Sequence, residues 1–167
     1  MNLYILRHGI ATEPNTQGLA KDADRPLTPE GKRKLWQIAE AMAALELGFD
    51  LVLSSPYVRA RQTAEIIVEA LKARKRLEFS DSLTPGGSTK KLVDLLNHLQ
   101  PPPESVLLVG HEPYLSGLIS LLVSGDASLA VVMKKGGLCK LSTDSLTHGR
   151  CAALEWLLTP KQMALMA

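Results

Sequence analysis

The chain has 167 residues, of which 46% are hydrophobic and 22% are charged, enough for one domain with a buried core and too few for two ordinary domains. Its 19 Lys and Arg residues nearly balance 17 Asp and Glu residues, and the net charge of +2 argues against a general nucleic-acid-binding protein. The longest apolar stretch, residues 115–123, is interrupted by Ser and Gly and is too short to span a bilayer, so we expect no membrane association.

The cysteines and the amino terminus indicate the cellular compartment. Cys139 and Cys151 are the only cysteines, and their spacing fits neither a metal site nor a disulfide framework, whereas reduced thiols are typical of the cytosol. The first residues lack the positively charged segment of a signal peptide and run directly into an apolar strand pattern. We therefore expect a cytoplasmic protein.

The first predicted elements are a strand and a long helix. Residues 3–6 form an apolar run that predicts a buried strand, followed by a tight Arg-His-Gly loop at residues 7–9. Residues 10–26 are polar and predict a loop over the end of this strand. A helix is expected to begin after Thr28, which serves as its N-cap before a proline and an acid, and Gly48 is expected to end it.

The middle of the chain predicts a second strand and two further helices. Residues 51–53 form the strand, and the Ser-Ser-Pro sequence at residues 54–56 is expected to cap the next helix. Basic residues at positions 74–76 are expected at the end of that helix, where cations suit the helix dipole. The apolar pattern over residues 88–99 predicts a third helix, and three prolines after it prevent continuation.

The last third of the chain predicts the centre and the edge of a sheet. Residues 106–109 are all apolar and form the clearest central strand, followed by Gly-His-Glu-Pro at residues 110–113 and another helix. Residues 131–133 and 138–141, joined through two glycines, predict a hairpin at the sheet edge. Residues 152–158 predict a last strand.

The order of these elements predicts the fold class. Alternating strands and helices are typical of an α/β protein with a mostly parallel sheet. We expect a single three-layer α/β/α domain over residues 1–167, with the C-terminal hairpin at the edge of its central sheet. The short chain without internal repeats or linkers is compatible with a monomer, which is the state we expect.

Three predicted strand ends carry basic or imidazole side chains. Arg7 and His8 follow the first strand, Arg59 lies in the first turn of the helix after the second, and His111 follows the central strand. Because the carboxyl ends of parallel strands meet at one edge of a sheet, these four side chains are predicted to share a pocket. Histidine can attack phosphorus, arginine can hold phosphate oxygens in a fork, and helix N-termini favour anions. The sequence therefore predicts a phosphoryl-transfer site.

Five segments carry motifs in a fixed order between residues 5 and 117. They are Leu6-Arg7-His8-Gly9; Arg25-Pro26-Leu27-Thr28 with Gly31; Ser54-Ser55-Pro56-Tyr57-Val58-Arg59-Ala60 with Gln62-Thr63-Ala64; Leu83-Thr84-Pro85; and Val109-Gly110-His111-Glu112-Pro113. Together they resemble the histidine phosphatase superfamily, of phosphoglycerate mutase-like fold, and most closely its small SixA-type phosphohistidine phosphatases. The last fifty residues carry no motif.

The resemblance implies a role for each of the four site residues. His8 is expected to be the nucleophile that carries a transient phosphoryl group, and Arg7, Arg59 and His111 are expected to bind the phosphoryl oxygens. Nearby arginines lower the pKa of an imidazole and keep it neutral, and a backbone carbonyl of the loop is expected to hold the other ring nitrogen. We expect no metal or other cofactor, because fixed cations meet the developing charge.

The sequence departs from the superfamily at the general acid. Many larger members carry a Glu or Asp after the second helix, but residues 82–87 of this chain contain no carboxylate. An alkoxide leaving group needs a proton in the transition state, whereas an imidazole can leave with little help. The gap therefore favours phosphohistidine over phosphate esters and argues against mutase activity. We interpret Asp81 as an acidic residue of a turn and Glu112 as an acidic residue in the first turn of a helix, where the helix dipole favours it. For each of them, a role in proton transfer is the alternative.

The chain also lacks the long insertions that cap the site in larger relatives. An open groove suits a phosphohistidine carried on a protein, such as a phosphotransfer domain or carrier, better than a small metabolite. Two other functions stay open: a phosphatase of the same superfamily that acts on a small phosphate ester, and a module that binds phosphate without turnover. The complete set of Arg7, His8, Arg59 and His111 argues against the binding module, which needs no nucleophile.

Several residues have simpler interpretations than a site. Taken alone, His8 could be a loop histidine, Arg59 a solvated helix residue and His111 a helix cap; the other motifs favour the site. We interpret His98 and His148 as surface residues. The basic run Lys72 to Arg76 is expected to be a solvated helix end, with contact to an acidic partner as the alternative. A role for Thr84 or Ser88 in the pocket is left open.

Overall fold

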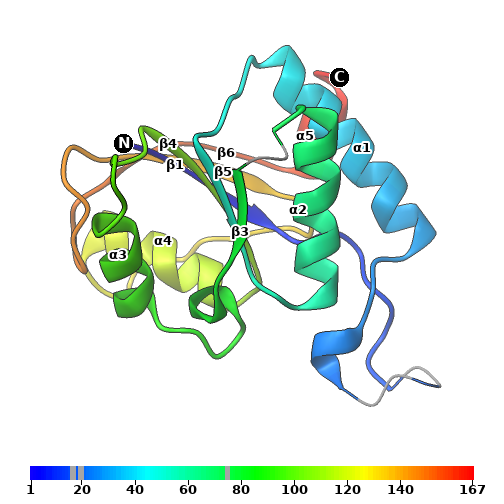
Figure 1. The fold of residues 1–167 in the computed structure, drawn as a ribbon, viewed down its shortest axis with the longest axis horizontal. Helices are drawn as coiled ribbons and strands as arrows, with labels where there is room; N and C mark the ends of the chain where they lie inside the picture. The colour runs from blue at the N-terminus through cyan, green and yellow to red at the C-terminus, as the bar shows by residue number, and fades with distance from the viewer. Residues whose placement is uncertain (16–17, 19–20, 74–75) are drawn as a thin grey trace.

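The central sheet has six strands in the order β3-β2-β4-β1-β5-β6 (Figure 1). In this computed structural model, which describes residues 1–15, 18, 21–73 and 76–167, strands β1 to β4 are mutually parallel, and β5 is antiparallel to both β1 and β6. The strands are β1 (Asn2–Arg7), β2 (Leu51–Ser54), β3 (Leu77–Phe79), β4 (Ser105–Gly110), β5 (Leu138–Ser142) and β6 (Ala153–Leu158). The predicted fold class, a mostly parallel sheet with an antiparallel pair of C-terminal strands at one edge, is confirmed.

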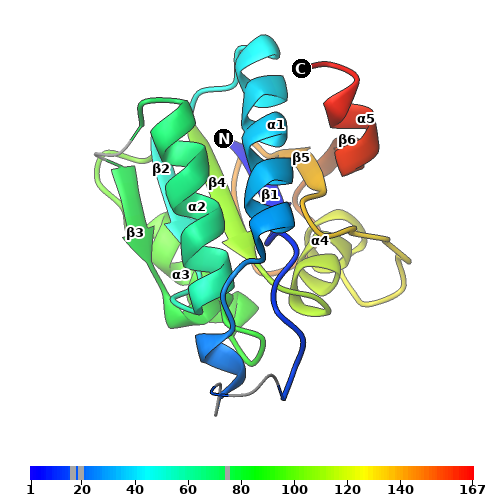
Figure 2. The same ribbon diagram turned by 90° about the vertical axis from the view of Figure 1, so that its right-hand side faces the viewer.

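Helices cover both faces of this sheet (Figures 1 and 2). One face carries α1, α2 and α5, and the opposite face carries α3 and α4. The helices are α1 (Pro29–Ala44), α2 (Val58–Ala70), α3 (Thr89–Asn97), α4 (Tyr114–Ser124) and α5 (Pro160–Ala164), with short 3-10 turns η1 (Asp22–Asp24) and η3 (Asp81–Leu83). The result is the predicted three-layer α/β/α arrangement.

The strand sequences explain how the sheet separates two hydrophobic cores. Side chains of a strand point alternately to opposite faces. In β1, Leu3 and Ile5 pack with α3 and α4, whereas Tyr4 and Leu6 pack with α1 and α2. The four apolar residues at positions 106–109 in β4 are all fully buried, as expected for a central parallel strand covered on both faces.

Helix α1 begins as the sequence predicts. The Thr28 hydroxyl accepts a hydrogen bond from the Gly31 backbone N–H at 3.0 Å, and Pro29 is the first helical residue. The helix ends at Ala44, however, and not at Gly48. The chain turns at Glu46, which adopts a positive φ of 54°. The Leu47 backbone N–H donates a hydrogen bond to the Met42 carbonyl and so caps the helix before Gly48 is reached. The predicted end at Gly48 is therefore wrong.

The predicted cap of the second helix is also wrong. Ser54 belongs to β2, and α2 begins at Val58 with Tyr57 as its N-cap and no side-chain cap. Ser55 accepts a hydrogen bond from the Tyr57 backbone N–H, and the same hydroxyl contacts a histidine of the site described below. The sequence predicts that basic residues 74–76 end this helix, but α2 ends earlier, at Ala70. Residues 74 and 75 lie outside the described residues.

The edge hairpin forms from different segments than the sequence predicts. Residues 131–133 form no strand; β5 pairs instead with β1 along its whole length and with β6 on its other side. The Met133 carbonyl accepts a hydrogen bond from the Arg7 guanidinium, and Gly136 N–H donates to the Arg7 carbonyl. These contacts tie the segment before β5 to the end of β1, so it is not free to pair with β5.

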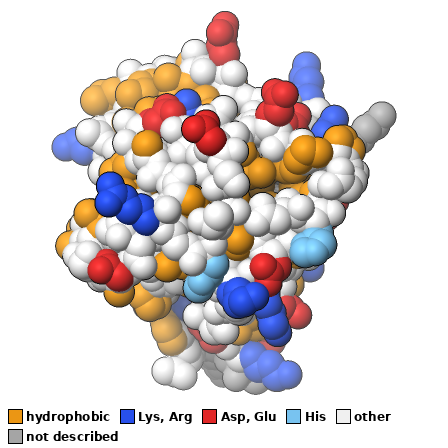
Figure 3. All heavy atoms as spheres, turned by 90° about the vertical axis from the view of Figure 1, so that its left-hand side faces the viewer, with side chains coloured by type: hydrophobic (Ala, Val, Ile, Leu, Met, Phe, Trp, Pro, Cys, Tyr) orange, Lys and Arg blue, Asp and Glu red, His pale blue; other side chains and the backbone are white. Residues whose placement is uncertain are grey.

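The third helix forms where the sequence predicts it and lies on a surface of mixed charge. Ser88 caps α3 by accepting a hydrogen bond from the Lys91 backbone N–H, although the helix ends two residues before position 99. Figure 3 shows the side of the molecule on which α3 lies, where Lys and Arg side chains are interspersed with Asp and Glu. Within the described ranges, every helix is too short or too polar to cross a membrane.

Candidate active site

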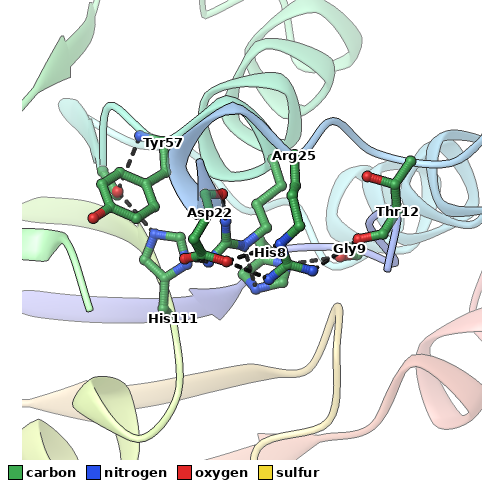
Figure 4. Close-up of polar contacts among 9 residues, drawn as sticks. His8, Gly9, Thr12, Asp22, Arg25, Tyr57 and His111 are labelled. Atoms are coloured by element: carbon green, nitrogen blue, oxygen red, sulfur yellow. Dashed lines mark hydrogen bonds and ion pairs between the residues drawn. The ribbon is translucent and has the colours of Figure 1, made fainter. Parts of the chain in front are cut away.

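The four predicted site residues lie together at the carboxyl ends of neighbouring strands. His8 follows β1, His111 follows β4, and Arg59 lies at the start of α2, which follows β2. The strand register explains the meeting, because Arg7 of β1 pairs with Gly110 of β4. Parallel strands of an open α/β sheet place their ligand-binding residues at this edge. Figure 4 shows His8 and His111 in this cluster, and their ring centroids are 5.1 Å apart.

His8 is held in one tautomer by its own loop. Its Nδ1 lies 2.7 Å from the carbonyl oxygen of Gly9, and a carbonyl oxygen only accepts hydrogen bonds. Nδ1 therefore carries the proton, and the lone pair is on Nε2, which accepts a hydrogen bond from the Arg59 Nε–H at 3.2 Å. This is the arrangement that a nucleophilic imidazole needs, and it matches the backbone contact predicted from the sequence.

Burial keeps the His8 ring neutral. The side chain is buried, and the pKa of His8 falls from 6.5 to about 4. Burial is the largest cause, the charges of Arg59, Arg7 and Lys135 act in the same direction, and the Gly9 hydrogen bond opposes them. The sequence predicted the direction from the arginines alone, whereas desolvation contributes most.

The charges of Arg7 and Arg59 both act on the His8 ring, and Arg59 also contacts it directly. Arg7 donates from NH1 to the Met133 carbonyl at 2.8 Å, and its buried Nε has no hydrogen-bond partner among the described residues. Arg59 is only 3% exposed, and burial lowers its pKa although the Asp22 carboxylate opposes this. Both guanidinium groups remain charged at neutral pH. They supply fixed positive charge where an anionic group would meet His8.

His111 completes the cluster. Its Nε2 lies 2.8 Å from the Ser55 hydroxyl, and its buried Nδ1 has no hydrogen-bond partner among the described residues. Burial first, and then the charges of Arg59 and His8, lower the pKa of His111 to about 3. The Tyr57 ring packs edge-on against the His111 ring, with centroids 5.2 Å apart. The imidazole is therefore neutral, and one of its nitrogens is available to a ligand.

The sequence did not identify Ser55 or Asp22 as site residues. Asp22 accepts hydrogen bonds from Arg59 NH2 at 3.1 Å through its carboxylate and from Arg59 NH1 at 2.8 Å through its backbone carbonyl. Arg25, which the sequence placed in a motif without a role, binds the same carboxylate. The signal for Asp22 was its position three residues before Arg25, but a polar loop contains many such acids. The signal for Ser55 was its place just after a strand, four residues before Arg59 of the same motif.

Two hydrogen bonds of Thr63 connect the loop that follows His8 to Arg59. The Thr63 hydroxyl accepts a hydrogen bond from the Gly9 backbone N–H at 3.1 Å and donates one to the Arg59 carbonyl at 2.7 Å. Gly9 is also closely packed, because a Cβ atom there would lie 2.7 Å from a methyl group of Leu35. Helices α1 and α2 thus determine where the loop and its carbonyl oxygen lie.

The remaining candidates lie outside this cluster or serve local structure. The Glu112 carboxylate accepts a hydrogen bond from the Ser116 backbone N–H near the start of α4, and Asp81 opens η3. The Thr84 hydroxyl donates to the Asp81 carbonyl, and the Ser88 hydroxyl caps α3. None of these contacts places the residue against His8.

The surface histidines and Arg76 of the basic run do not contribute to the site either, and residues 74 and 75 of that run lie outside the described residues. His98 is exposed beside the Asp94 carbonyl, and His148 contacts Thr89. Arg76 lies just before β3 and donates a hydrogen bond to the carbonyl of Asp50, which lies just before β2. Both residues are at the amino ends of the strands, whereas the site is at the carboxyl ends. No group of three or more metal-ligating side chains was found in the described part of the chain.

The sequence comparisons agree with this geometry. A family profile described as the histidine phosphatase superfamily (branch 1) matches residues 3–84. The phosphohistidine phosphatase SixA of Escherichia coli (strain K12) is 31% identical over 127 residues, which cover 75% of this chain and 76% of that protein.

Solved structures show the same fold over nearly the whole chain. A structure of the protein histidine phosphatase SixA complexed with tungstate superposes with a TM-score of 0.81 at 26% identity, covering 96% of this chain and 98% of the other. The fold alone is shared with a putative alpha-ribazole-5'-P phosphatase from Escherichia coli (strain K-12 substr. MG1655), with a TM-score of 0.75 at 20% identity, covering 96% and 97% of the two chains. A chain with these motifs, this site and these relatives belongs to the histidine phosphatase superfamily, as a phosphatase of the SixA type.

Proposed function

We propose that this protein removes the phosphoryl group from phosphohistidine on a protein substrate, through a phospho-His8 intermediate. The observation that carries the proposal is the contact between His8 Nδ1 and the Gly9 carbonyl, which leaves the Nε2 lone pair as the nucleophile. Arg7 and Arg59 lie near this atom, and His111 Nδ1 has no hydrogen-bond partner among the described residues; these groups would bind the phosphoryl oxygens once Arg59 exchanges a present partner. The similarity to SixA proteins supports the same reaction class.

In the first step, His8 Nε2 attacks phosphorus and a new P–N bond forms. The bond between phosphorus and the substrate imidazole breaks, and that imidazole leaves with the bonding electron pair and takes a proton from water. In the second step, water attacks the phosphorus of phospho-His8, the electron pair of the P–Nε2 bond returns to His8, and a proton of the water goes to solvent. Arg7, Arg59 and His111 stabilise the charge on the equatorial oxygens in both steps.

The states of Asp22 and Glu112, the two carboxylates considered as general acids, support an imidazole leaving group. Partial burial raises the pKa of Asp22, but the hydrogen bonds and charges of Arg25 and Arg59 outweigh this effect and hold the pKa below its usual value. Asp22 is therefore ionised at neutral pH and has no proton to donate to an alkoxide. Glu112 is engaged with the backbone of α4. A leaving group that departs without a general acid fits this site best.

The direct test is phosphate release from a phosphohistidine-bearing protein in the presence of EDTA. We expect rapid release by the wild-type protein and a loss of about a thousandfold in His8→Ala, as for removal of a nucleophile. His98→Ala is the matched control, because His98 is an exposed histidine that hydrogen-bonds locally in α3. No release by a folded wild-type protein that binds phosphate would contradict the proposal.

The same assay separates the alternatives. A shared fold with a putative alpha-ribazole-5'-P phosphatase keeps small phosphate esters as the second candidate substrate class. Faster hydrolysis of an alkyl phosphate than of phosphohistidine would favour that class. Phosphate binding without turnover of either substrate would favour a sensing module.

A further inference from the structure

The Asp22 carboxylate occupies a position among the phosphoryl-binding groups. One of its oxygens accepts a hydrogen bond from Arg25 Nε at 2.8 Å and lies 2.7 Å from Arg25 NH2. The other accepts a hydrogen bond from Arg59 NH2 at 3.1 Å. Figure 4 shows Asp22 beside His111 and His8, and its charge acts on the His111 ring. The Asp22 carboxylate thus lies near Arg25, Arg59 and His111, three groups that can bind anionic oxygens.

Each of the three nitrogens of Arg59 donates one hydrogen bond in this arrangement. Its Nε–H donates to the Nε2 lone pair of His8, and its two terminal nitrogens donate to the carbonyl and the carboxylate of Asp22. The same lone pair of His8 must attack phosphorus, and it cannot do so while it accepts the Arg59 hydrogen bond. Attack on phosphorus therefore requires the Arg59 Nε–H to leave His8, so the hydrogen bonds of Arg59 must rearrange when a phosphoryl group binds.

Carboxylate and phosphoryl oxygens compete for the same kind of donor. Both are anionic acceptors that match the planar fork of a guanidinium. Asp22 lies on η1, and its side chain is 53% exposed, whereas that of Arg59 is 4% exposed. Because Arg59 is buried and Asp22 reaches it from the surface, the carboxylate is the partner that can withdraw.

We propose that Asp22 is a positioning residue that substitutes for a phosphoryl oxygen on Arg59 and leaves this arginine when the phosphoryl group binds. The proposal rests on the proposed function only in requiring that the site bind phosphoryl groups. Its consequence is weaker binding of every phosphoryl ligand, including the phosphate product, than the arginines alone would give. Competition of this kind favours product release.

The test is calorimetric titration of inorganic phosphate into the wild-type protein, Asp22→Asn and Asp24→Asn. Asp24 lies on the same turn, is exposed and gives the same change in net charge, so it controls for the general loss of a negative charge. We expect Asp22→Asn to bind phosphate about fivefold more tightly than the wild-type protein, and Asp24→Asn to stay within about twofold. Equal affinities of the two variants, or weaker binding by Asp22→Asn, would overturn the proposal.

Two further measurements keep this result interpretable. Steady-state kinetics should show a lower KM for Asp22→Asn with little change in kcat, whereas a structural role for Asp22 would lower kcat and the melting temperature without tightening phosphate binding. Asp22→Ser serves as the second variant if the asparagine variant does not fold, with the same expected direction. If the wild-type protein binds no phosphate, the proposed function fails together with this proposal. If the wild-type protein binds phosphate but Asp22→Asn binds it no more tightly than Asp24→Asn does, Asp22 does not compete with phosphate for Arg59.

Discussion

The Nδ1 atom of His8 and the carbonyl oxygen of Gly9, the next residue in the chain, lie 2.7 Å apart. This contact places the imidazole proton on Nδ1 and the lone pair on Nε2. Gly9 is itself held by Thr63 of α2 and packed against Leu35 of α1. The orientation of His8 therefore depends on how two helices hold one peptide group, and mutations in these helices test this dependence.

Gly9→Ala tests the packing of that peptide group. The new Cβ atom would lie 2.7 Å from a Leu35 methyl group and 3.3 Å from one of Leu27, so the loop or these side chains must move. We expect the free energy of unfolding to fall by about 1–3 kcal/mol, and kcat to fall because the carbonyl that orients His8 shifts. Urea denaturation and kinetics measure the two effects. Gly48→Ala, where a Cβ meets nothing within 4 Å, is the control and should change neither by much.

Thr63→Val tests the hydrogen bonds that join the loop to Arg59. Valine keeps the shape of the side chain but leaves the buried Gly9 N–H without its acceptor and the Arg59 carbonyl without this donor. We expect a loss of about 1–3 kcal/mol in the free energy of unfolding, together with a lower kcat. Thr63→Ser keeps the hydroxyl and should retain most of the activity. If the valine variant were as active as the serine variant, the hydroxyl would not position the loop.

Ser55→Ala tests the orientation of His111. The change removes the only hydrogen-bond partner found for the His111 ring among the described residues and frees the ring to change tautomer. Loss of a buried hydrogen bond worth about 1–3 kcal/mol corresponds to about a fivefold to 150-fold fall in kcat/KM. Ser54→Ala is the control, because the neighbouring Ser54 is equally buried but donates to the Ser55 carbonyl. Equal kinetics for the two variants would show that Ser55 does not orient the ring.

The two site histidines predict how stability depends on pH. Their pKa values fall from 6.5 to about 4 for His8 and about 3 for His111, with burial as the main cause. Below pH 6.5 the unfolded chain thus binds more protons than the folded chain, so acidification destabilises the fold until these folded-state pKa values are reached. The slope is at most about 1.4 kcal/mol per pH unit for each histidine.

Urea denaturation at a series of pH values between 7 and 5 measures this slope. The double variant His8→Asn, His111→Asn should lose most of the contribution, whereas His98→Asn should keep the slope of the wild-type protein. An unchanged slope in the double variant would mean that other groups cause the acid sensitivity of the protein.

The predictable part of the fold is the part that the sequence pattern determines locally. The apolar runs of β1 and β4 predict buried strands because both faces of these strands are covered. The N-cap at Thr28 follows from the residue types alone. The sequence also predicts that the four site residues lie together, because each lies at or just after a predicted strand end and parallel strands align those ends. These residues are Arg7, His8, Arg59 and His111.

The remaining features depend on tertiary contacts that no local pattern records. Residues 131–133 are apolar enough for a strand, but the Arg7 guanidinium binds the Met133 carbonyl, and β1 provides the neighbour of β5. Strand β3 has only three residues, lies at the sheet edge and has no buried residue, so no apolar run announces it. Asp22 joins the site because η1 folds back onto Arg59, and only the assembled loop shows that contact.

Identification of the phosphorylated atom during turnover is the most direct test of the phospho-His8 intermediate. The wild-type protein is mixed with a phosphohistidine-bearing protein, quenched in alkali and examined by peptide mass spectrometry, with NMR to assign the ring nitrogen. We expect a phosphoryl group on Nε2 of His8 and none in His8→Ala. Turnover without a phosphorylated His8, or a phosphoryl group on Nδ1, would contradict it.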